Sequence, residues 1–325
     1  MLSRKKKIQL NGRDVGKTPM LLPSVSSRIN LEVKKTLDII SEIIVFGPLL
    51  VSALDCYKKH ITSIPFAELV FLDSGGYECQ KDQEISDNGF YYCKEKNWTI
   101  NKYLTVINSW NKDIPTVLIS FDHPKIRIPI ANQISDANIF FEGKDDFLKE
   151  ILIKPEKRKS FKIKPENVIK EINSLASFDI IGFAEKDLGN SVFSRMISIA
   201  TIRKAMDENK IEKPLHIFGS LDTITTPLYY IAGADIFDGL SWLRYFFDKG
   251  NTHYLEGYGP KFYGVGVNQN TIGLQSATHN YEYLREMASA MSRFSTSKDF
   301  KCLGPNWKLF EKASKDLFET IGGEE

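Results

Sequence analysis

Short apolar segments that alternate with stretches of helical or mixed character are the feature that most constrains the fold of this 325-residue chain. Most of them are blocks of consecutive apolar residues, a pattern typical of parallel strands covered on both faces. The sequence predicts strands at 20–23, 43–46, 49–54, 69–72, 116–121, 179–184, 215–218 and 234–237, and helices at 100–112, 165–176, 191–209, 223–232, 281–295 and 307–321. This alternation predicts an α/β fold, and the number of strands favours a (β/α)8 barrel of the TIM type.

A doubly wound open sheet is the alternative architecture. No Gly-x-Gly-x-x-Gly motif follows the first expected strand, which disfavours a dinucleotide-binding fold of that kind. The chain shows neither an internal repeat nor a convincing linker, so we expect a single barrel domain over residues 1–325. Within it we expect insertions near 76–100 and 140–165.

The composition is that of an ordinary soluble globular protein, with 42% apolar and 26% charged residues. No apolar stretch reaches the roughly 18 residues of a membrane span, and no apolar signal core follows the basic start. The four cysteines include no Cys-x-x-Cys pair, which disfavours a disulfide framework or a four-cysteine zinc site. We therefore expect a cytoplasmic protein that has no contact with a membrane.

Three aspartates follow expected strands directly. Asp73 ends one strand, Asp122 ends a second and Asp238 ends a third. Because the C-terminal ends of barrel strands converge on one face, these carboxylates are expected to meet in one cleft. Grouped carboxylates acquire different protonation behaviour, which suits one to act as nucleophile and another as general acid or base. The alternative for each aspartate is a helix cap.

Asp73-Ser74-Gly75-Gly76-Tyr77 places a carboxylate, a hydroxyl, backbone amides and an aromatic ring at a strand end. This combination suits the binding of a flat polar heterocycle, although such a motif is also a common tight turn. Gly182, Phe218 and Gly219 lie at two other strand ends, where glycine lets a ligand approach the backbone. Tyr77 and Phe218 could stack on a planar base, and the alternative for Phe218 is barrel core.

Positive charge is local, because the net charge is only +2. Residues 154–170 contain seven lysines and arginines against two glutamates, 7 − 2 = +5, including Lys157, Arg158 and Lys159. Arg244 follows Asp238 closely. These side chains could contact phosphates, and the alternatives are a solvated loop and a surface ion pair.

Taken together, the motifs resemble those of the tRNA-guanine transglycosylase superfamily, in the same order and over residues 18 to about 295. The two aspartate motifs are the specific ones, close to the family's Asp-Ser-Gly-Gly-Phe/Tyr-Gln and Gly-x-Asp-x-Phe-Asp. The matching segments are Thr18-Pro19-Met20-Leu21-Leu22-Pro23-Ser24-Val25, Asp73-Ser74-Gly75-Gly76-Tyr77-Glu78, Ser120-Phe121-Asp122, His216-Ile217-Phe218-Gly219, Gly233-Ala234-Asp235-Ile236-Phe237-Asp238 and Thr278-His279-Asn280.

The resemblance implies an enzyme on a (β/α)8 barrel that exchanges guanine in a polynucleotide for a 7-deazaguanine. Asp238 would be the nucleophile on the ribose C1′, Asp73 the general acid and base, and Asp122 the acceptor at the purine edge. The base pocket would be formed by Ser74, Gly75, Gly76, Tyr77, Gly182, Phe218 and Gly219.

Three departures from the family pattern modify this expectation. The family holds a structural zinc with three cysteines and a histidine, but here only His279 remains, so we expect no metal and no other cofactor. Glu78 replaces the family's glutamine, and a Gly-Ile-Gln-Gln-Gly strand is not found between Asp122 and Gly182. With these departures, the chain resembles the branch of the superfamily that modifies DNA.

The leading hypothesis is therefore a DNA guanine transglycosylase that inserts a 7-deazaguanine such as the 7-cyano form. A tRNA enzyme with the same mechanism is the second hypothesis, and a non-catalytic nucleic-acid-binding partner subunit is the third. An unrelated barrel glycosidase with paired carboxylates is the fourth. The expected partners are a nucleic acid, with DNA favoured over tRNA, and the free 7-deazaguanine base. Whether the protein forms a homodimer is left open.

Overall fold

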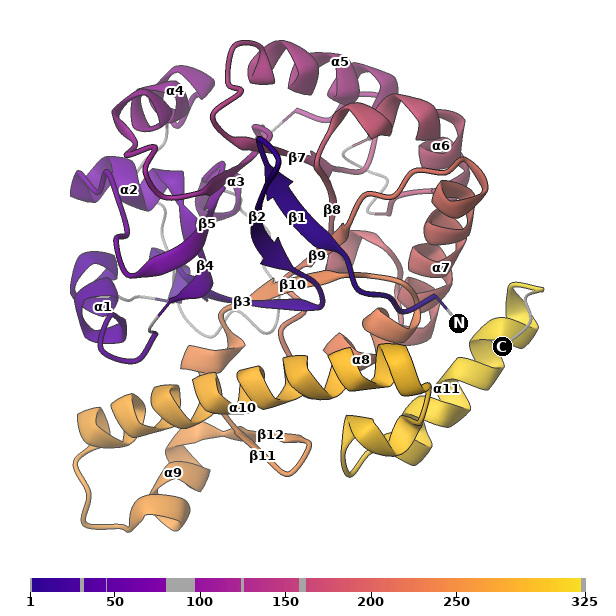
Figure 1. Cartoon of the computed structure of the whole chain (residues 1–325). Coiled ribbons are helices and arrows are strands. Elements are labelled where there is room, and N and C mark those ends of the chain that lie inside the picture. The colour runs from indigo at the N-terminus through magenta and orange to yellow at the C-terminus, as the bar shows by residue number, and fades with distance from the viewer. Residues whose placement is uncertain are drawn as a thin grey trace.

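Eight parallel strands close into a barrel in a computed structural model that describes residues 2–29, 32–44, 46–79, 97–123, 126–157 and 162–322 (Figure 1). The order around the barrel is β10-β3-β4-β5-β6-β7-β8-β9, so strands that are consecutive in the chain are neighbours and β10 closes onto β3. The strands are β3 (Met20–Val25), β4 (Gly47–Ser52), β5 (Ala67–Asp73), β6 (Thr116–Ile119), β7 (Leu148–Ile153), β8 (Ile180–Ala184), β9 (Leu215–Phe218) and β10 (Ile236–Gly239).

Helices form a ring around this barrel, as Figure 1 shows. They bury its outer face, which is the arrangement that parallel strands with apolar residues on both faces require. The helices of the ring are α1 (Val33–Ile40), α2 (Ala53–Lys59), α4 (Ile100–Ser109), α5 (Ile130–Phe141), α6 (Pro165–Lys170), α7 (Val192–Glu208) and α8 (Thr225–Ile231). Shorter helical turns are η1 (Ser27–Ile29), α3 (Gly76–Cys79), η2 (Ile172–Ser177), η3 (Glu185–Asp187) and η4 (Ser241–Leu243).

A hairpin of β1 (Lys7–Leu10) and β2 (Arg13–Lys17) lies across the end of the barrel at which the strands begin (Figure 1). Its two-residue turn, Asn11-Gly12, has positive φ at both positions, as a type I′ turn requires. Ile8 and Val15 of the hairpin are buried in the same cluster as the apolar residues inside the barrel. The hairpin therefore closes this end of the barrel with apolar side chains.

The chain after the barrel forms a second layer outside the ring (Figure 1). It consists of the hairpin β11 (Tyr245–Asp248) and β12 (Asn251–Tyr254), then α9 (Leu255–Tyr263), α10 (Gln269–Ser297), η5 (Phe300–Leu303) and α11 (Trp307–Thr320). Asn280 of α10 joins this layer to η4, because its side-chain amide donates to the carbonyls of Trp242 in η4 and Tyr245 in β11 and accepts from Phe247 N–H of β11.

The barrel interior changes from apolar to polar along the strands. Alternate strand residues face the same side, so a strand with an inward apolar residue can present a polar residue two positions later. Phe71 of β5 lies in the inner apolar cluster and Asp73 follows it, just as Leu22 of β3 is followed by Ser24. Polar side chains thus gather where the strands end, beyond an apolar plug.

The (β/α)8 fold expected from the sequence is confirmed, but one expected strand was wrong and one barrel strand was not expected. The expected strand at 43–46 is turn and loop where it is described, and Phe46, with φ of 53°, is 75% exposed. The barrel strand β7 was not expected, and it lies within 140–165, so that segment is not an insertion as a whole. The charged Lys149 and Glu150 interrupt its apolar pattern.

The expected helices are present with shifted ends; α10, for example, begins at Gln269 rather than 281. Residues 80–96, most of the other expected insertion, lie outside the described residues. In the part of the chain that the structure describes, no helix has the length and apolar character to cross a membrane.

Candidate functional site

Asp73, Asp122 and Asp238 all lie where barrel strands end, as the sequence predicted. Asp73 is the last residue of β5, Asp238 lies in β10, and Asp122 follows β6. Each is buried but keeps 9%, 6% and 7% of its surface exposed, respectively. The charges of Asp122 and Asp238 both act on Asp73. The barrel therefore brings the three carboxylates into one electrostatic neighbourhood.

Asp238 is held by three groups in or directly after the two strands that flank β10, which are β3 and β9. Its Oδ2 accepts a 2.9 Å hydrogen bond from Ser24 Oγ of β3, and its Oδ1 accepts one of 2.9 Å from the N–H of Gly219. His216 Nε2 of β9 lies 3.4 Å from the same Oδ1. Gly219 can offer its N–H in this position because its φ is +81°, a conformation natural to glycine.

His216 and Glu150 form a buried pair beside Asp238 that the sequence had not identified as part of the site. His216 Nδ1 lies 2.8 Å from Glu150 Oε1 of β7, and both side chains are 0% exposed. Burial acts to lower the pKa of His216, but the charge of Glu150 and the bond and charge of Asp238 outweigh it and raise that pKa to about 9. The sequence did offer one signal for this pair, because Glu150 lies beside Lys149 in a segment whose other residues are apolar.

Asp73 is in a different environment from Asp238. Its Oδ2 accepts a 3.2 Å hydrogen bond from Gly75 N–H within its own turn. Burial, and next the charge of Glu78, raise the pKa of Asp73 well above its ordinary value, and the charges of Asp122 and Asp238 add to that rise. Such surroundings favour the protonated form of a carboxyl group, which is the form that can deliver a proton.

The turn after Asp73 is fixed on both sides. Ser74 Oγ accepts a 3.1 Å hydrogen bond from Asp122 N–H, and Ser74 C=O accepts one of 2.8 Å from Trp98 Nε1. Gly75 has φ of +83°, and a Cβ there would lie 2.8 Å from Leu54 Cβ. A Cβ at Gly76 would lie 2.5 Å from the carbonyl oxygen of Asp122. Both glycines are therefore required by the packing of this turn, whatever ligand it binds.

Glu78 does not face an open pocket. Its two carboxyl oxygens accept hydrogen bonds of 2.6 Å from Ser26 Oγ and 2.7 Å from Ser52 Oγ, and the residue is 2% exposed. Burial and the charge of Asp55 raise the pKa of Glu78 to about 7. Glu78 therefore acts on the site through its charge and by tying the turn to β3 and β4.

Asp122 lies between two cations at the edge of a cavity. Arg127 Nη1 is 3.3 Å from its Oδ1, and Lys154 Nζ is 3.7 Å from its Oδ2 and 3.0 Å from Asp187 Oδ2. The cavity has a volume of about 620 Å³, and Asp122 is the one of the three strand-end aspartates among its described lining residues. Aromatic and aliphatic side chains, including Trp98 and Phe140, form most of its wall.

Tyr77 and Phe218, expected to stack on a base, each have a partner within the protein. The Phe218 ring stacks on His216 with centroids 3.9 Å apart, and the Arg28 guanidinium lies 4.9 Å from the Tyr77 ring centroid. Tyr77 is 36% exposed, whereas Phe218 is half-buried. A Cβ at Gly182 would lie 2.6 Å from the Phe218 ring and 2.7 Å from Glu150 Oε1.

The expected phosphate-binding residues are only partly described. Arg244 is half-buried, and its guanidinium lies 5.6 Å from the Tyr245 ring centroid. Lys157 is exposed, while Arg158 and Lys159 lie outside the described residues.

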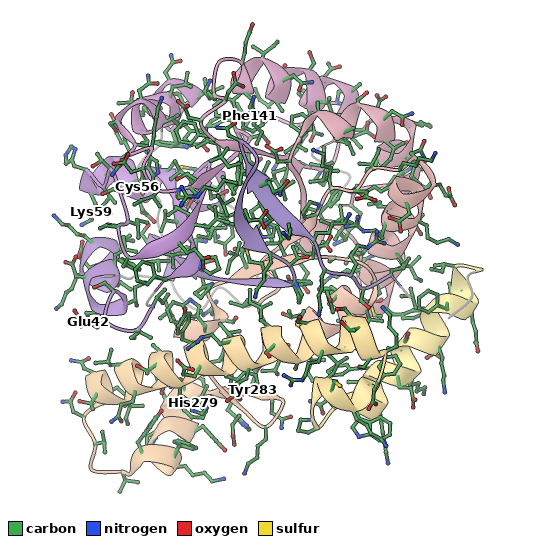
Figure 2. All side chains as sticks on the ribbon, viewed as in Figure 1. Glu42, Cys56, Lys59, Phe141, His279 and Tyr283 are labelled. Atoms are coloured by element: carbon green, nitrogen blue, oxygen red, sulfur yellow. The ribbon has the colours of Figure 1, made fainter. Side chains whose placement is uncertain are left out.

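His279, which matches a zinc ligand in the resemblance, makes other contacts here. Its Nε2 lies 2.8 Å from Phe247 C=O, and its ring stacks on Phe246 at 4.6 Å. Figure 2 shows His279 and Tyr283 on α10, which lies outside the barrel, and Tyr283 Oη accepts from Gly250 N–H of the β11–β12 hairpin. Within the described ranges, no group of three or more His, Cys, Asp or Glu side chains could hold a metal ion.

Comparison with models of known protein families and with curated proteins gave no match for this chain.

Proposed function

We propose that this protein is a base-exchange transglycosylase that replaces guanine in DNA with a 7-deazaguanine through a covalent aspartyl–nucleotide intermediate. One observation carries the proposal above the others: Asp73 and Asp238 lie at the same end of the barrel in contrasting environments, and the charge of Asp238 acts on Asp73. Carboxyl groups whose environments differ in this way can divide the roles of proton donor and nucleophile.

The proposed first step forms a bond between a carboxylate oxygen of Asp238 and C1′ of the deoxyribose. The C1′–N9 bond to guanine breaks, its electron pair goes to the base, and the proton of Asp73 is transferred to that base. In the second step Asp73 removes a proton from the incoming 7-deazaguanine. The nitrogen of that base attacks C1′, and the carboxylate of Asp238 is released.

The surroundings of the two carboxyl groups support these roles. Hydrogen bonds from Ser24 and Gly219 hold the Asp238 carboxylate in one orientation. The raised pKa of Asp73 favours its protonated form, which is the form that a donor to the leaving base needs. Asp122 lies at the cavity edge, where its carboxylate would accept from the N–H groups of a purine that has been flipped out of its stack, in place of part of its contact with Arg127 and Lys154.

The preference for DNA over tRNA rests on the sequence departures from the resemblance, in particular the missing cysteines around His279. A tRNA enzyme of the same mechanism and a silent partner subunit remain the alternatives that an experiment has to separate.

The test incubates the protein with a labelled 7-deazaguanine and either duplex DNA or tRNA, and follows the label in the polymer. We expect incorporation into DNA, and trapping of a protein–DNA adduct by denaturing electrophoresis, which Asp238→Ala abolishes. Asp145→Ala is the matched control, because the Asp145 side chain is 85% exposed and pairs only locally with Lys149. Incorporation of the label into tRNA alone would mean that the polymer substrate is tRNA and not DNA. Full activity of Asp238→Ala would exclude the proposed mechanism.

A further inference from the structure

A chain of three side chains, two of which are fully buried, runs from β7 to β10. Glu150 Oε1 lies 2.8 Å from His216 Nδ1, and His216 Nε2 lies 3.4 Å from Asp238 Oδ1. The three residues come from strands that are not all neighbours, and neither Glu150 nor His216 is accessible to a ligand, since both are 0% exposed. Their chemistry can reach a substrate only through Asp238.

We propose that His216, held in place by Glu150, is a positioning residue that orients the Asp238 carboxylate and directs its Oδ2 toward the sugar. This inference rests on the proposed function, in which Asp238 is the nucleophile. It assigns no new chemical step, because His216 and Glu150 do not touch the reacting atoms.

The hydrogen-bond pattern distinguishes the two oxygens of Asp238. Oδ1 accepts from Gly219 N–H and also faces His216 Nε2, whereas Ser24 Oγ is the donor to Oδ2. The Ser24 oxygen itself accepts a 3.1 Å hydrogen bond from Gly239 N–H, which leaves the hydroxyl proton for Asp238. Within the described part of the chain, Oδ2 thus has fewer contacts and keeps a lone pair for attack.

The same geometry defines the charge of His216. Each ring nitrogen faces a carboxylate oxygen, Nδ1 at 2.8 Å from Glu150 Oε1 and Nε2 at 3.4 Å from Asp238 Oδ1, and an ionised carboxylate only accepts, so this geometry favours a proton on both nitrogens. Two aromatic rings also lie against the imidazole, with Phe71 edge-on at 5.7 Å and Phe218 stacked. Among the described residues, the titratable groups that act on His216 are Glu150 and Asp238, and its pKa, raised to about 9 against the effect of burial, agrees with an imidazolium at neutral pH.

Gly182 supports this arrangement from the neighbouring strand β8. A Cβ at this position would lie 2.7 Å from Glu150 Oε1 and 2.6 Å from the Phe218 ring. Glycine therefore provides the space in which Glu150 and Phe218 both close around His216.

The first test is independent of enzymatic activity. Nuclear magnetic resonance follows the imidazole signals of the five histidines as the pH is raised, with His216 assigned by substitution. We expect His216 to remain protonated at pH 8 in the wild-type protein and its pKa to fall in Asp238→Asn and in Glu150→Gln. Titration near the ordinary value of 6.5 in the wild type, or no change in Asp238→Asn, would overturn the inference whether or not the protein exchanges bases.

The second test measures adduct formation. Because His216→Gln removes the imidazolium that faces Asp238 Oδ1, it is expected to slow formation of the protein–DNA adduct about 10- to 100-fold while thermal unfolding shows a folded protein. His60→Asn is the control, because His60 is exposed at the end of α2 and should react at the wild-type rate. Equal rates for folded His216→Gln and wild type would refute the positioning role. Absence of any adduct in the wild type would instead refute the proposed function, and the titration would still decide the state of His216.

Discussion

The N–H of Asp122 donates a 3.1 Å hydrogen bond to Oγ of Ser74, which joins the chain after β6 to the turn after β5. Both residues are buried, so neither group can readily exchange this bond for one with water. Two positions of the candidate site, 48 residues apart, are thereby fixed to each other before any ligand binds.

Ser74→Ala is expected to lower the free energy of unfolding by about 1–3 kcal/mol, because it leaves the buried N–H of Asp122 without an acceptor. Urea denaturation measures this change. Ser109→Ala is the control, since the exposed Ser109 hydroxyl bonds only to Val106 C=O in its own helix, and it should change stability by less than about 0.5 kcal/mol. Equal effects of the two substitutions would contradict the prediction.

Gly75→Ala is expected to destabilise the protein more than Gly143→Ala. Both glycines have positive φ, +83° and +69°, which costs an alanine about 1–2 kcal/mol. A Cβ at Gly75 would also lie 2.8 Å from Leu54 Cβ and 2.9 Å from Trp98 Nε1, whereas a Cβ at Gly143 meets no atom within 4 Å. The overlap adds about 1–3 kcal/mol, which thermal unfolding of the two variants should resolve.

Glu78 should make stability depend on pH. Its pKa is about 7 in the folded protein and 4.5 in the reference state, so the folded state prefers the protonated form. Stability is therefore fully present below pH 4.5 and is lost as the pH rises through 7, by a total on the order of 3 kcal/mol. Glu78→Gln should be more stable than wild type at pH 8 and similar to it at pH 4.5 in urea denaturation. The exposed Glu282 is the control, and Glu282→Gln should have the same small effect at both values.

The same substitution should lower the pKa of Asp73, because the charge of Glu78 is, after burial, the largest cause of its rise. If Asp73 has to carry a proton for guanine to leave, base exchange slows at the pH at which Asp73 loses that proton. A lower pKa of Asp73 in Glu78→Gln would therefore move the alkaline limb of the pH–rate profile to lower pH. The pH profile of label incorporation measures this shift. An unchanged alkaline limb would show that Glu78 does not tune the proton donor.

Arg203→Met is expected to cost about 3–5 kcal/mol, because it removes the cation that pairs directly with the buried Asp235. Arg203 and Asp235 are both 0% exposed and form a salt bridge at the base of β10. Arg285→Met removes a pair whose side chains are 65% and 57% exposed and should cost less than about 1 kcal/mol. Comparable losses in the two variants, measured by urea denaturation, would mean that the buried pair does not stabilise the fold.

The sequence predicted the barrel and the strand-end aspartates because both are local features. Apolar blocks that stop at a polar residue indicate where a buried strand ends, as at Asp73 and Asp238, and parallel strands bring such ends together. The Asn11-Gly12 turn was a readable hairpin signal as well, but the strands beside it are short and carry charged residues.

The pairing of His216 with Glu150 could not be predicted in the same way. The two residues are 66 positions apart. Glu150 also lies in β7, the strand that was not predicted because the charged Lys149 and Glu150 interrupt its apolar pattern. For Phe218 the sequence left base stacking and barrel core open, and the ring stacks on His216. Which inward side chains touch depends on strand register and on the space that Gly182 provides, and neither can be read from one segment.

The β1–β2 hairpin covers the end of the barrel opposite the three aspartates. Ile8 and Val15 pack there against the apolar residues of the barrel interior, which separate that end from the polar side chains at the strand ends. If the proposed base exchange takes place beside Asp73, the departing base and its replacement would both have to use the end of the barrel at which the strands finish. The two bases would then pass in turn, and a bound polymer would lie over the same end.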